Sequence, residues 1–403
     1  MNKIEFYKET NFKETSIGKI PKDWESLELG EIIEVFDSER IPLSEMERSK
    51  RKGPYPYCGA TGIIDWIDGY IFDGEYILLV EDGGPFGKFE KKAYIMSGKF
   101  WVNNHAHVLK AVKDKGSNYF LLYLLNYLDL NQYTVGSTRK KLNQEHMKQI
   151  IIPLPPIEEQ KAVAEVLSTV DEAVQKTNEI IAKTERLKKG LMQTLLTKGI
   201  GHKEFKDIEI GRIPKEWEVV KLKDVADIIM GQSPPSTTYN KEGIGLPFLQ
   251  GKMEFGEVYP SPVMFCSNPL KIAEVNDILI SVRAPVGDIN LAPYKLCIGR
   301  GLAAIRFKRE AANYLFYFYY LQKVKSFLEM LGKGSTFKAI VKEDLENLKV
   351  PLVPPSEQEK IAEILSTVDK KLELERKEKA RLERIKQGLM DLLLTGKVRV
   401  RVN

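Results

Sequence analysis

The side chains in this sequence that can do chemistry are mainly amides, hydroxyls and cations in two stretches, residues 26–150 and 219–333. Asn, Gln and Arg can make paired hydrogen bonds to base edges in the major groove of DNA, and Lys and Arg can contact phosphates. These side chains favour contact rather than catalysis, although an ordinary surface or turn role is the better explanation for each residue taken singly. The predicted contact residues are Tyr57, Thr61, Lys88, Asn103, Asn104, His105, Arg139 and Lys140 in the first stretch, Gln232, Ser233, Gln250, Lys252, Arg283 and Arg300 in the second, and Lys338 just beyond it.

Two of these cations have distinct predicted roles. Arg300 stands between Gly299 and Gly301, and glycines would allow its guanidinium a close approach to a groove, where a bidentate contact reads guanine. The alternative for Arg300 is an ion pair with a carboxylate of its own domain. Lys338 follows a Gly-Ser-Thr turn and is predicted to hold phosphate.

Catalytic arrangements are not evident. Ser267-Asn268-Pro269-Leu270 lacks the second proline and the aromatic residue of an amino-methylating motif, and the Gly-Lys pairs at 87–88 and 251–252 lack the other residues of a phosphate-binding loop. His105 and His107 have no identified third metal ligand, and no Ser, His and Asp grouping stands out. We predict a chain without catalytic residues, metal or cofactor of its own.

The sequence segments that are predicted to position these side chains occur twice. Residues 159–171 return at 357–369, residues 188–192 at 386–390, and residues 136–138 at 334–336, all at an offset of 198. An opening block, residues 18–25, returns at 211–218 at an offset of 193, whereas the stretches between the repeated blocks hardly match. A domain-sized period predicts pseudo-twofold duplication. The repeated blocks would form two similar frames, and each unmatched stretch between them would form a different domain, here called a head.

Two long helices are predicted at the ends of the frames. A short apolar strand closed by prolines, residues 150–156, precedes the first helix, and at the start of the second Ser356 precedes Glu359 at capping-box spacing. The apolar seam then has a period near 3.5, typical of coiled coils, over about 40 residues or roughly 60 Å. We expect the helices to pair antiparallel. Gly190 and Gly388 predict a bend or a close backbone, or else a break before a short last turn.

The heads have the pattern of compact, mixed or mainly β domains. Short apolar runs such as 76–80, 94–96 and 101–102 alternate with Gly, Asp and Asn in the first head, and runs 277–282 and 302–306 do so in the second. Residues 55–62 are predicted to form a Gly-rich, aromatic-bearing loop. A helix is expected near 119–127 in the first head and near 313–331 in the second.

Composition sets wide bounds. The 403 residues are 29% charged and 43% hydrophobic, as in ordinary globular proteins, and no apolar run is long enough to cross a bilayer. The N-terminus lacks an apolar signal core, so we expect a cytoplasmic protein. Three widely separated cysteines argue against disulfides and a zinc site. The net charge of +5 is only a weak indication of a nucleic-acid partner.

One family combines these features. The Gly-Ser-Thr turn at 334–336 followed by 350-Val-Pro-Leu-Val-Pro-Pro-Ser-Glu-Gln-358, its first copy at 136–160, and the two Gly-x-Ile-Pro-x-x-Trp openings resemble the DNA specificity subunit of type I restriction-modification systems. The resemblance covers essentially the whole chain. It implies an α+β fold, with two target recognition domains at 1–152 and 201–350, and conserved helical segments at 153–200 and 351–403 that pack as an antiparallel coiled coil.

The resemblance also implies partners. Each domain would read one half of a split double-stranded DNA target. Two methyltransferase (modification) subunits would carry S-adenosylmethionine, and separate ATP-driven restriction subunits would carry ATP and Mg. The competing hypotheses are a self-contained DNA methyltransferase or nuclease with degenerate motifs, and a helical protein-binding scaffold that binds no DNA.

Overall fold

The computed structural model describes residues 4–209, 211–308, 312–331 and 339–402. These residues form two compact units. The first comprises residues 1–178 together with 377–403, and the second comprises residues 179–376. The structure therefore groups the sequence segments differently from a division into heads and helices, because each unit contains one head and a part of both long helices.

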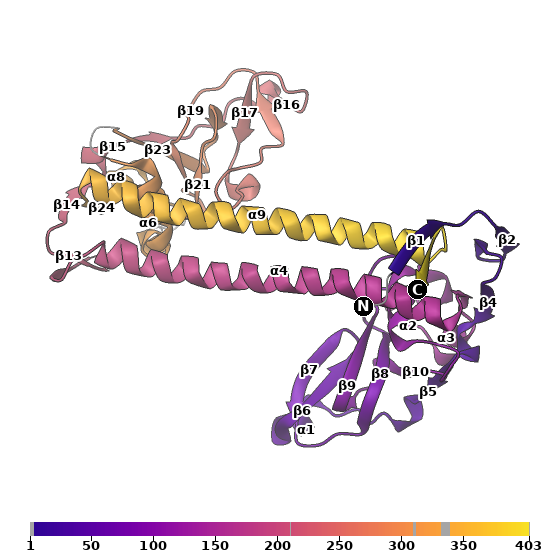
Figure 1. Ribbon diagram of the computed structural model, residues 1–403. Coiled ribbons are helices and arrows are strands. Elements are labelled where there is room, and N and C mark those ends of the chain that lie inside the picture. Colours follow the sequence, from indigo (N-terminus) through magenta and orange to yellow (C-terminus); the bar gives the residue numbers. More distant parts are fainter. Residues whose placement is uncertain (1–3, 210, 309–311, 332–338, 403) are drawn as a thin grey trace. The chain divides into compact units, whose positions relative to one another are not determined.

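The first unit is built on a mixed sheet with the strand order β5-β10-β8-β9-β6-β7 (Figure 1). All its neighbouring pairs are antiparallel except β6 and β9, which pair in parallel at Tyr57–Trp101 and Cys58–Val102. Helix α2 (Asn118–Tyr127) packs its apolar side chains into the same core as β8 and β10. The strands are β5 (Ile33–Val35), β6 (Lys52–Gly59), β7 (Gly62–Ile67), β8 (Phe72–Val80), β9 (Ala93–Val102) and β10 (Ala106–Ala111).

Smaller elements complete this unit. They are β1 (Ile4–Lys8), which pairs with β25 (Val398–Val402), the hairpin β2 (Phe12–Thr15) and β3 (Gly18–Pro21), the pair β4 (Glu25–Glu28) and β11 (Ile151–Leu154), and the short helices η1 (Leu29–Glu31), η2 (Asp37–Glu39), α1 (Glu45–Lys50), η3 (Asn131–Tyr133) and α3 (Gln144–Lys148). The strand predicted before the first long helix is confirmed as β11.

The second unit repeats the frame around a different head. Its sheets have the orders β15-β23-β20-β21 and β16-β18-β17-β22-β19, with β17 and β22 again parallel. The strands are β12 (Phe205–Ile208), β13 (Gly211–Pro214), β14 (Glu218–Lys221), β15 (Ala226–Met230), β16 (Tyr239–Asn240), β17 (Leu246–Leu249), β18 (Met264–Cys266), β19 (Ile272–Ala273), β20 (Ile278–Ser281), β21 (Ile289–Leu291), β22 (Leu296–Ile298), β23 (Leu302–Phe307) and β24 (Lys349–Leu352). The short helices are α5 (Leu222–Val225), η4 (Ser236–Thr238), η5 (Lys252–Glu254), α6 (Tyr314–Lys323), α7 (Lys325–Leu331) and α8 (Lys342–Glu346).

The two long helices are α4 (Ile157–Lys198) and α9 (Pro355–Leu393), of 42 and 39 residues. Within the first unit, Asp171 early in α4 pairs with Lys386 late in α9 at 2.5 Å. Within the second, Lys188 late in α4 pairs with Asp369 in the first half of α9 at 2.6 Å. Because an early residue of α4 pairs with a late residue of α9 and a late residue of α4 with an early one of α9, the two pairs together require opposite chain directions, and the predicted antiparallel pairing is confirmed.

Several sequence expectations are corrected. No break follows Gly190 or Gly388, because both helices continue past them, and a Cβ placed at either glycine would meet nothing within 4 Å. Helix α9 begins at Pro355, so Ser356 lies inside its first turn rather than at the N-cap. The predicted helix at 313–331 is two helices, because Val324 leaves helical geometry (φ −93°, ψ 17°).

The repeated Glu-Gln pair at the start of each long helix makes the same contacts in both units. The Trp24 indole N–H donates to Glu159 at 3.1 Å, and the Trp217 indole N–H donates to Glu357 at the same distance. The adjacent glutamines are fully buried. Gln160 accepts from the backbone N–H of Ser117, the N-cap of α2, as Gln358 does from Asn313, the N-cap of α6. Each long helix is thereby attached to its own head by the same two side chains. None of the described helices combines the length and apolar character needed to cross a membrane.

Candidate nucleic-acid interface

In the first head, one corner of the sheet gathers four of the loops that contain predicted contact residues. The corner lies where β8 ends, where β9 turns into β10 and where residues 139–141 pass. Asp82 accepts from His105 Nδ1 and from Arg139 Nη2, both at 2.7 Å. Asn103 Oδ1 accepts from the backbone N–H of His105 at 2.8 Å. Thr61, in the β6–β7 turn, is close to Gly84, since a Cβ there would be 3.6 Å from Thr61 Cγ2.

Exposure differs among these residues. Asn104 and Thr61 are exposed, and the Arg139 side chain is also largely open to solvent in spite of its ion pair with Asp82. Asn103 is buried and serves to hold the turn. This corner therefore presents amide, hydroxyl and guanidinium groups to solvent, with an acidic side chain among them.

Three predicted contact residues of the first head are engaged elsewhere. The loop predicted at 55–62 is strand β6 and its turn into β7, and Tyr57 on β6 is 1% exposed, with its hydroxyl accepting from the Leu43 backbone N–H at 2.8 Å. As it stands, Tyr57 cannot form part of a contact surface. Lys88 pairs with Asp391 of helix α9 at 3.1 Å, and Lys140 donates to Asn131 at 2.5 Å. Lys88 therefore serves the attachment of the head to α9 within the first unit.

A buried polar network supports the corner from below. His107 Nδ1 is 2.6 Å from Asp37, and its Nε2 is 2.7 Å from the Leu142 carbonyl, so His107 does not join His105 in a common site. Burial by itself would raise the pKa of Asp37, but hydrogen bonds from His107 and the Val108 backbone and the Arg40 charge bring it below its usual value. The Asp37, Glu81 and His107 ligand atoms lie within 4.8 Å of one another.

Two cations already occupy that network. Arg40 and Lys141 pair with Glu81 at 2.6 and 2.9 Å. A metal ion would have to compete with both positive charges, so the cluster is better explained as a support for the loop that continues from Arg139 to Leu142.

The second head has a corresponding corner. The Ser233 hydroxyl oxygen accepts from Gln250 Nε2 at 2.8 Å and from the Arg300 backbone N–H at 3.2 Å. Gln232, Gln250 and Arg300 are exposed there. The fold thus brings together predicted contact residues from three separate loops.

Close backbone packing accounts for the glycines around Arg300. A Cβ at Gly301 would lie 2.6 Å from the Gln250 carbonyl oxygen, and one at Gly231 would lie 2.1 Å from the Gly299 carbonyl oxygen. Side chains at these positions would separate the loops. The packing explains these glycines without reference to DNA, and the groove contact of Arg300 stays a prediction.

Backbone hydrogen bonds make the two corners equivalent in position. Asn103 N–H donates to the carbonyl of Cys58 on β6, and Gly299 N–H donates to that of Leu249 on β17. One residue further along, Asn104 therefore corresponds to Arg300.

A second pair of equivalent bonds extends the match. Glu81 N–H donates to His105, as Val282 N–H does to Gly301, both at 2.9 Å. Asp82 bridges to Lys141 as Arg283 bridges to Ala339. An acidic residue in the first corner is thus replaced by an arginine in the second.

The cations of the second head are not all alike. Arg283 and Arg300 are exposed, and neither has a carboxylate partner among the residues that the structure describes. Lys252 instead pairs with Asp288, which also holds Lys325 at 2.6 Å. Lys338 and the Gly-Ser-Thr turn before it lie outside the described residues.

Two features of the first head were not predicted from the sequence, namely Asp82 and the apolar edge strand β7. Asp82 holds His105 and Arg139 in the first corner, and its correspondence with Arg283 appears only when the backbone bridges are matched. Ile64 and Trp66 are about half exposed on β7, which the sequence pattern did not distinguish from core residues.

Comparison with known proteins identifies the family. The family model for the type I restriction modification DNA specificity domain matches residues 21–186 and again residues 214–384. The chain belongs to this family. It is a specificity subunit, which targets DNA sequences and is not itself catalytic.

Relatives agree over the full length. A protein named type I restriction enzyme MjaX specificity subunit, from Methanocaldococcus jannaschii, is 44% identical, and the match covers 99% of both chains. The MjaVIII specificity subunit of the same organism is 32% identical over 99% of this chain and 98% of its own.

Solved structures agree as well. A chain from a structure of a type I R-M system is 28% identical, with a TM-score of 0.55 over 94% of this chain and 99% of the other. The S subunit from M. genitalium, 17% identical with a TM-score of 0.67 over 92% and 96% of the two chains, supports the fold alone.

Proposed function

We propose that this specificity subunit reads a bipartite, asymmetric double-stranded DNA target, one half with each head. The two corners support this most directly. They occupy equivalent places in the two heads, but one presents Asn104 and Arg139 around Asp82, whereas the other presents Gln232, Gln250, Arg283 and Arg300. Equivalent positions with unlike donors and acceptors would select unlike base pairs.

Contacts in each corner divide by chemistry. Amides and Arg300 are suited to base edges, because they can make paired hydrogen bonds. Exposed cations such as Arg283, and Lys338 from its place in the sequence, are suited to phosphates, which position a protein without reading sequence. In the first corner Asp82 is engaged by Arg139 and His105, so the exposed Asn104 amide and Arg139 guanidinium are the groups suited to a base edge.

The frame supports the proposed partners. Each long helix begins at the same Trp-Glu contact, made twice in the chain, so the frame is built alike in both units, which suits two like subunits. We propose that two modification subunits carrying S-adenosylmethionine bind the frame, and that restriction subunits using ATP and Mg join them, in the cytoplasm.

Binding selection tests the proposal. The purified chain with its modification subunits is incubated with random duplex DNA at several salt concentrations, and bound DNA is sequenced. We expect two unlike conserved blocks separated by unselected base pairs. A single conserved block, or no selection at any salt concentration, would contradict the proposal. Methylation by the chain alone, with S-adenosylmethionine added, would instead support a self-contained methyltransferase.

A further inference from the structure

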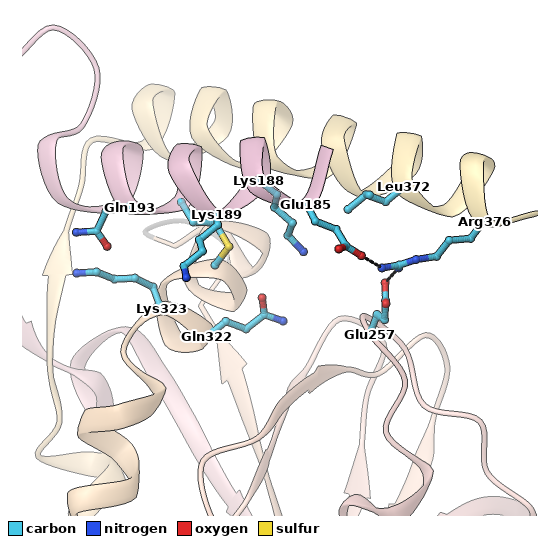
Figure 2. Close-up of a pocket in the computed structure, with 10 residues that line it drawn as sticks. Glu185, Lys188, Lys189, Gln193, Glu257, Gln322, Lys323, Leu372 and Arg376 are labelled. Atoms are coloured by element: carbon cyan, nitrogen blue, oxygen red, sulfur yellow. Dashed lines mark hydrogen bonds and ion pairs between the residues drawn. The ribbon is translucent and has the colours of Figure 1, made fainter. Parts of the chain in front are cut away.

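A groove of about 540 Å³ lies inside the second unit, between the C-terminal half of α4, helix α6 and the loop that contains Glu257. Figure 2 shows Lys189 and Gln193 extending from α4 toward Gln322 and Lys323 at the end of α6. Met192 and Leu372 supply part of an apolar wall. The predicted DNA-contact residues are not among those that line this groove.

Some charges in the groove are neutralised from within. Lys188 pairs with Asp369 at 2.6 Å. Arg376 holds Glu185 at 2.7 Å and also pairs with Glu257, which closes one end of the groove (Figure 2). These pairs account for both carboxylates that line the groove.

Lys189 and Lys323 are different, because neither has a carboxylate partner within the described part of the chain. Lys323 is only partly exposed, and burial lowers its pKa. A partly buried ammonium group without a counter-ion is unfavourable, and an anion bound beside it would relieve that cost. The side-chain amides of Gln193 and Gln322 add N–H donors on the same groove.

In the first unit, the charged side chains at the corresponding positions are paired with one another. By the repeat, Lys386 corresponds to Lys188 and is paired in the same way, with Asp171. Asp391 corresponds to Gln193, and it accepts from the Tyr127 hydroxyl at 2.8 Å and pairs with Lys88.

The positions of Lys323 and Lys189 also carry different charges in the two units. Tyr127 is the last residue of α2, as Lys323 is of α6, and both helices have ten residues. Gln387 stands where the second unit has Lys189. The first groove thus contains its own acid, whereas the second has glutamine at that position and lysines at the other two.

We infer that the groove of the second unit binds a phosphate group through Lys189, Lys323 and the amides of Gln193 and Gln322. Lysine is a common point-charge ligand for phosphate, and a phosphate has enough acceptor oxygens for two ammonium and two amide groups. The phosphate could come from free phosphate or a nucleotide, or from the DNA backbone. Binding of the DNA backbone rests on the proposed function, whereas binding of free phosphate or a nucleotide does not.

Two variants test the site. Lys189→Gln combined with Lys323→Gln removes both cations, whereas Gln193→Asp keeps them and introduces the acid found in the first unit. Lys183→Gln is the matched control, because Lys183 is an exposed lysine of the same helix outside the groove. Melting temperatures without ligand establish that each variant is folded.

Binding of inorganic phosphate and of ATP without metal is measured by calorimetry at constant ionic strength. Binding of duplex DNA is measured by titration at several salt concentrations, with the modification subunits present. We expect both groove variants to weaken binding of at least one probe about tenfold relative to wild type, with the control unchanged. An effect on phosphate and ATP identifies a free-phosphate site, and an effect on DNA with a shallower salt dependence identifies a backbone contact.

Equal binding of all three probes by wild type, groove variants and control would overturn the inference. If wild type binds no DNA, the proposed function fails, but the phosphate and ATP measurements still decide the groove.

Discussion

At the scale of single residues, Arg300 and Asn104 occupy equivalent turns in the two heads. Arg300 is exposed beside Ser233 and Gln250 and lacks a carboxylate partner in the described part of the chain. We expect Arg300→Ala to reduce discrimination by about 1 to 3 kcal/mol, and only in the half of the target read by the second head. Asn104→Ala should act only on the other half. Titrations against single-base variants of the selected target measure both effects.

Lys338→Ala is the comparison for Arg300→Ala. Loss of a phosphate contact should weaken binding to every sequence and reduce the salt dependence. If Arg300→Ala shows that same uniform loss, Arg300 contacts the backbone and does not read bases.

A second residue-scale prediction concerns pH. Burial by itself would lower the pKa of His202, but hydrogen bonding to Glu357 and the charges of Glu357 and Glu216 raise it above its usual value. The favourable pairing is therefore fully present below about pH 6.5, the value expected for the unfolded chain. It is lost as pH rises through the higher pKa of the folded state. In the first unit, Glu159 is paired instead with Arg399 at 2.6 Å, and arginine stays charged over this range.

Hydrogen exchange separates the two junctions. The backbone amides of Trp217 and Trp24 make equivalent bonds, to Pro214 and Pro21. After correction for intrinsic exchange, protection at Trp217 should fall between about pH 6 and pH 8 while protection at Trp24 stays level. His202→Gln should remove the difference. Parallel behaviour at both tryptophans in the wild type would refute the assignment.

At the scale of elements, the glycines in the long helices offer a direct test of continuity. Gly190 and Gly388 are exposed inside unbroken helices, and nothing lies within 4 Å of a Cβ added to either. Alanine at each position should raise the free energy of unfolding by about 1 kcal/mol. Denaturant unfolding of both single variants measures it. A loss of stability would mean that the helix bends or is interrupted at the glycine.

The long helices could be predicted because a heptad seam over about 40 residues leaves few alternatives. Strand bounds were harder. The runs at 94–96 and 101–102 belong to one strand, β9. The three residues between them, Ser97, Gly98 and Lys99, are exposed, so they lack apolar side chains although the strand continues through them. Tyr57 looked like a loop residue because prolines and glycines surround it, yet β6 has strand partners on both sides.

The site could be predicted in part for a related reason. Residues whose type suits DNA are visible in sequence, and Ser233, Gln250 and Arg300 do meet. Their arrangement depends on strand register, which no local pattern records. The replacement of Asp82 by Arg283 emerges only from matched backbone bridges.

At the scale of the whole molecule, we propose that two different heads on two similar frames recognise an asymmetric target. Both heads leave their frames through equivalent strand pairs, β4 with β11 and β14 with β24. Replacing residues 219–333 with a second copy of residues 26–135 should therefore preserve the junctions while making the heads identical. The variant is compared with the wild type, both with modification subunits, in selection from random duplex DNA.

We predict that the wild-type chain selects two unlike half-sites and that the variant selects an inverted repeat of the half-site read by the first head. The first half-site should be the same in both selections. If the variant with identical heads still selects an asymmetric target, the heads do not determine the sequence that is read, and the account is wrong.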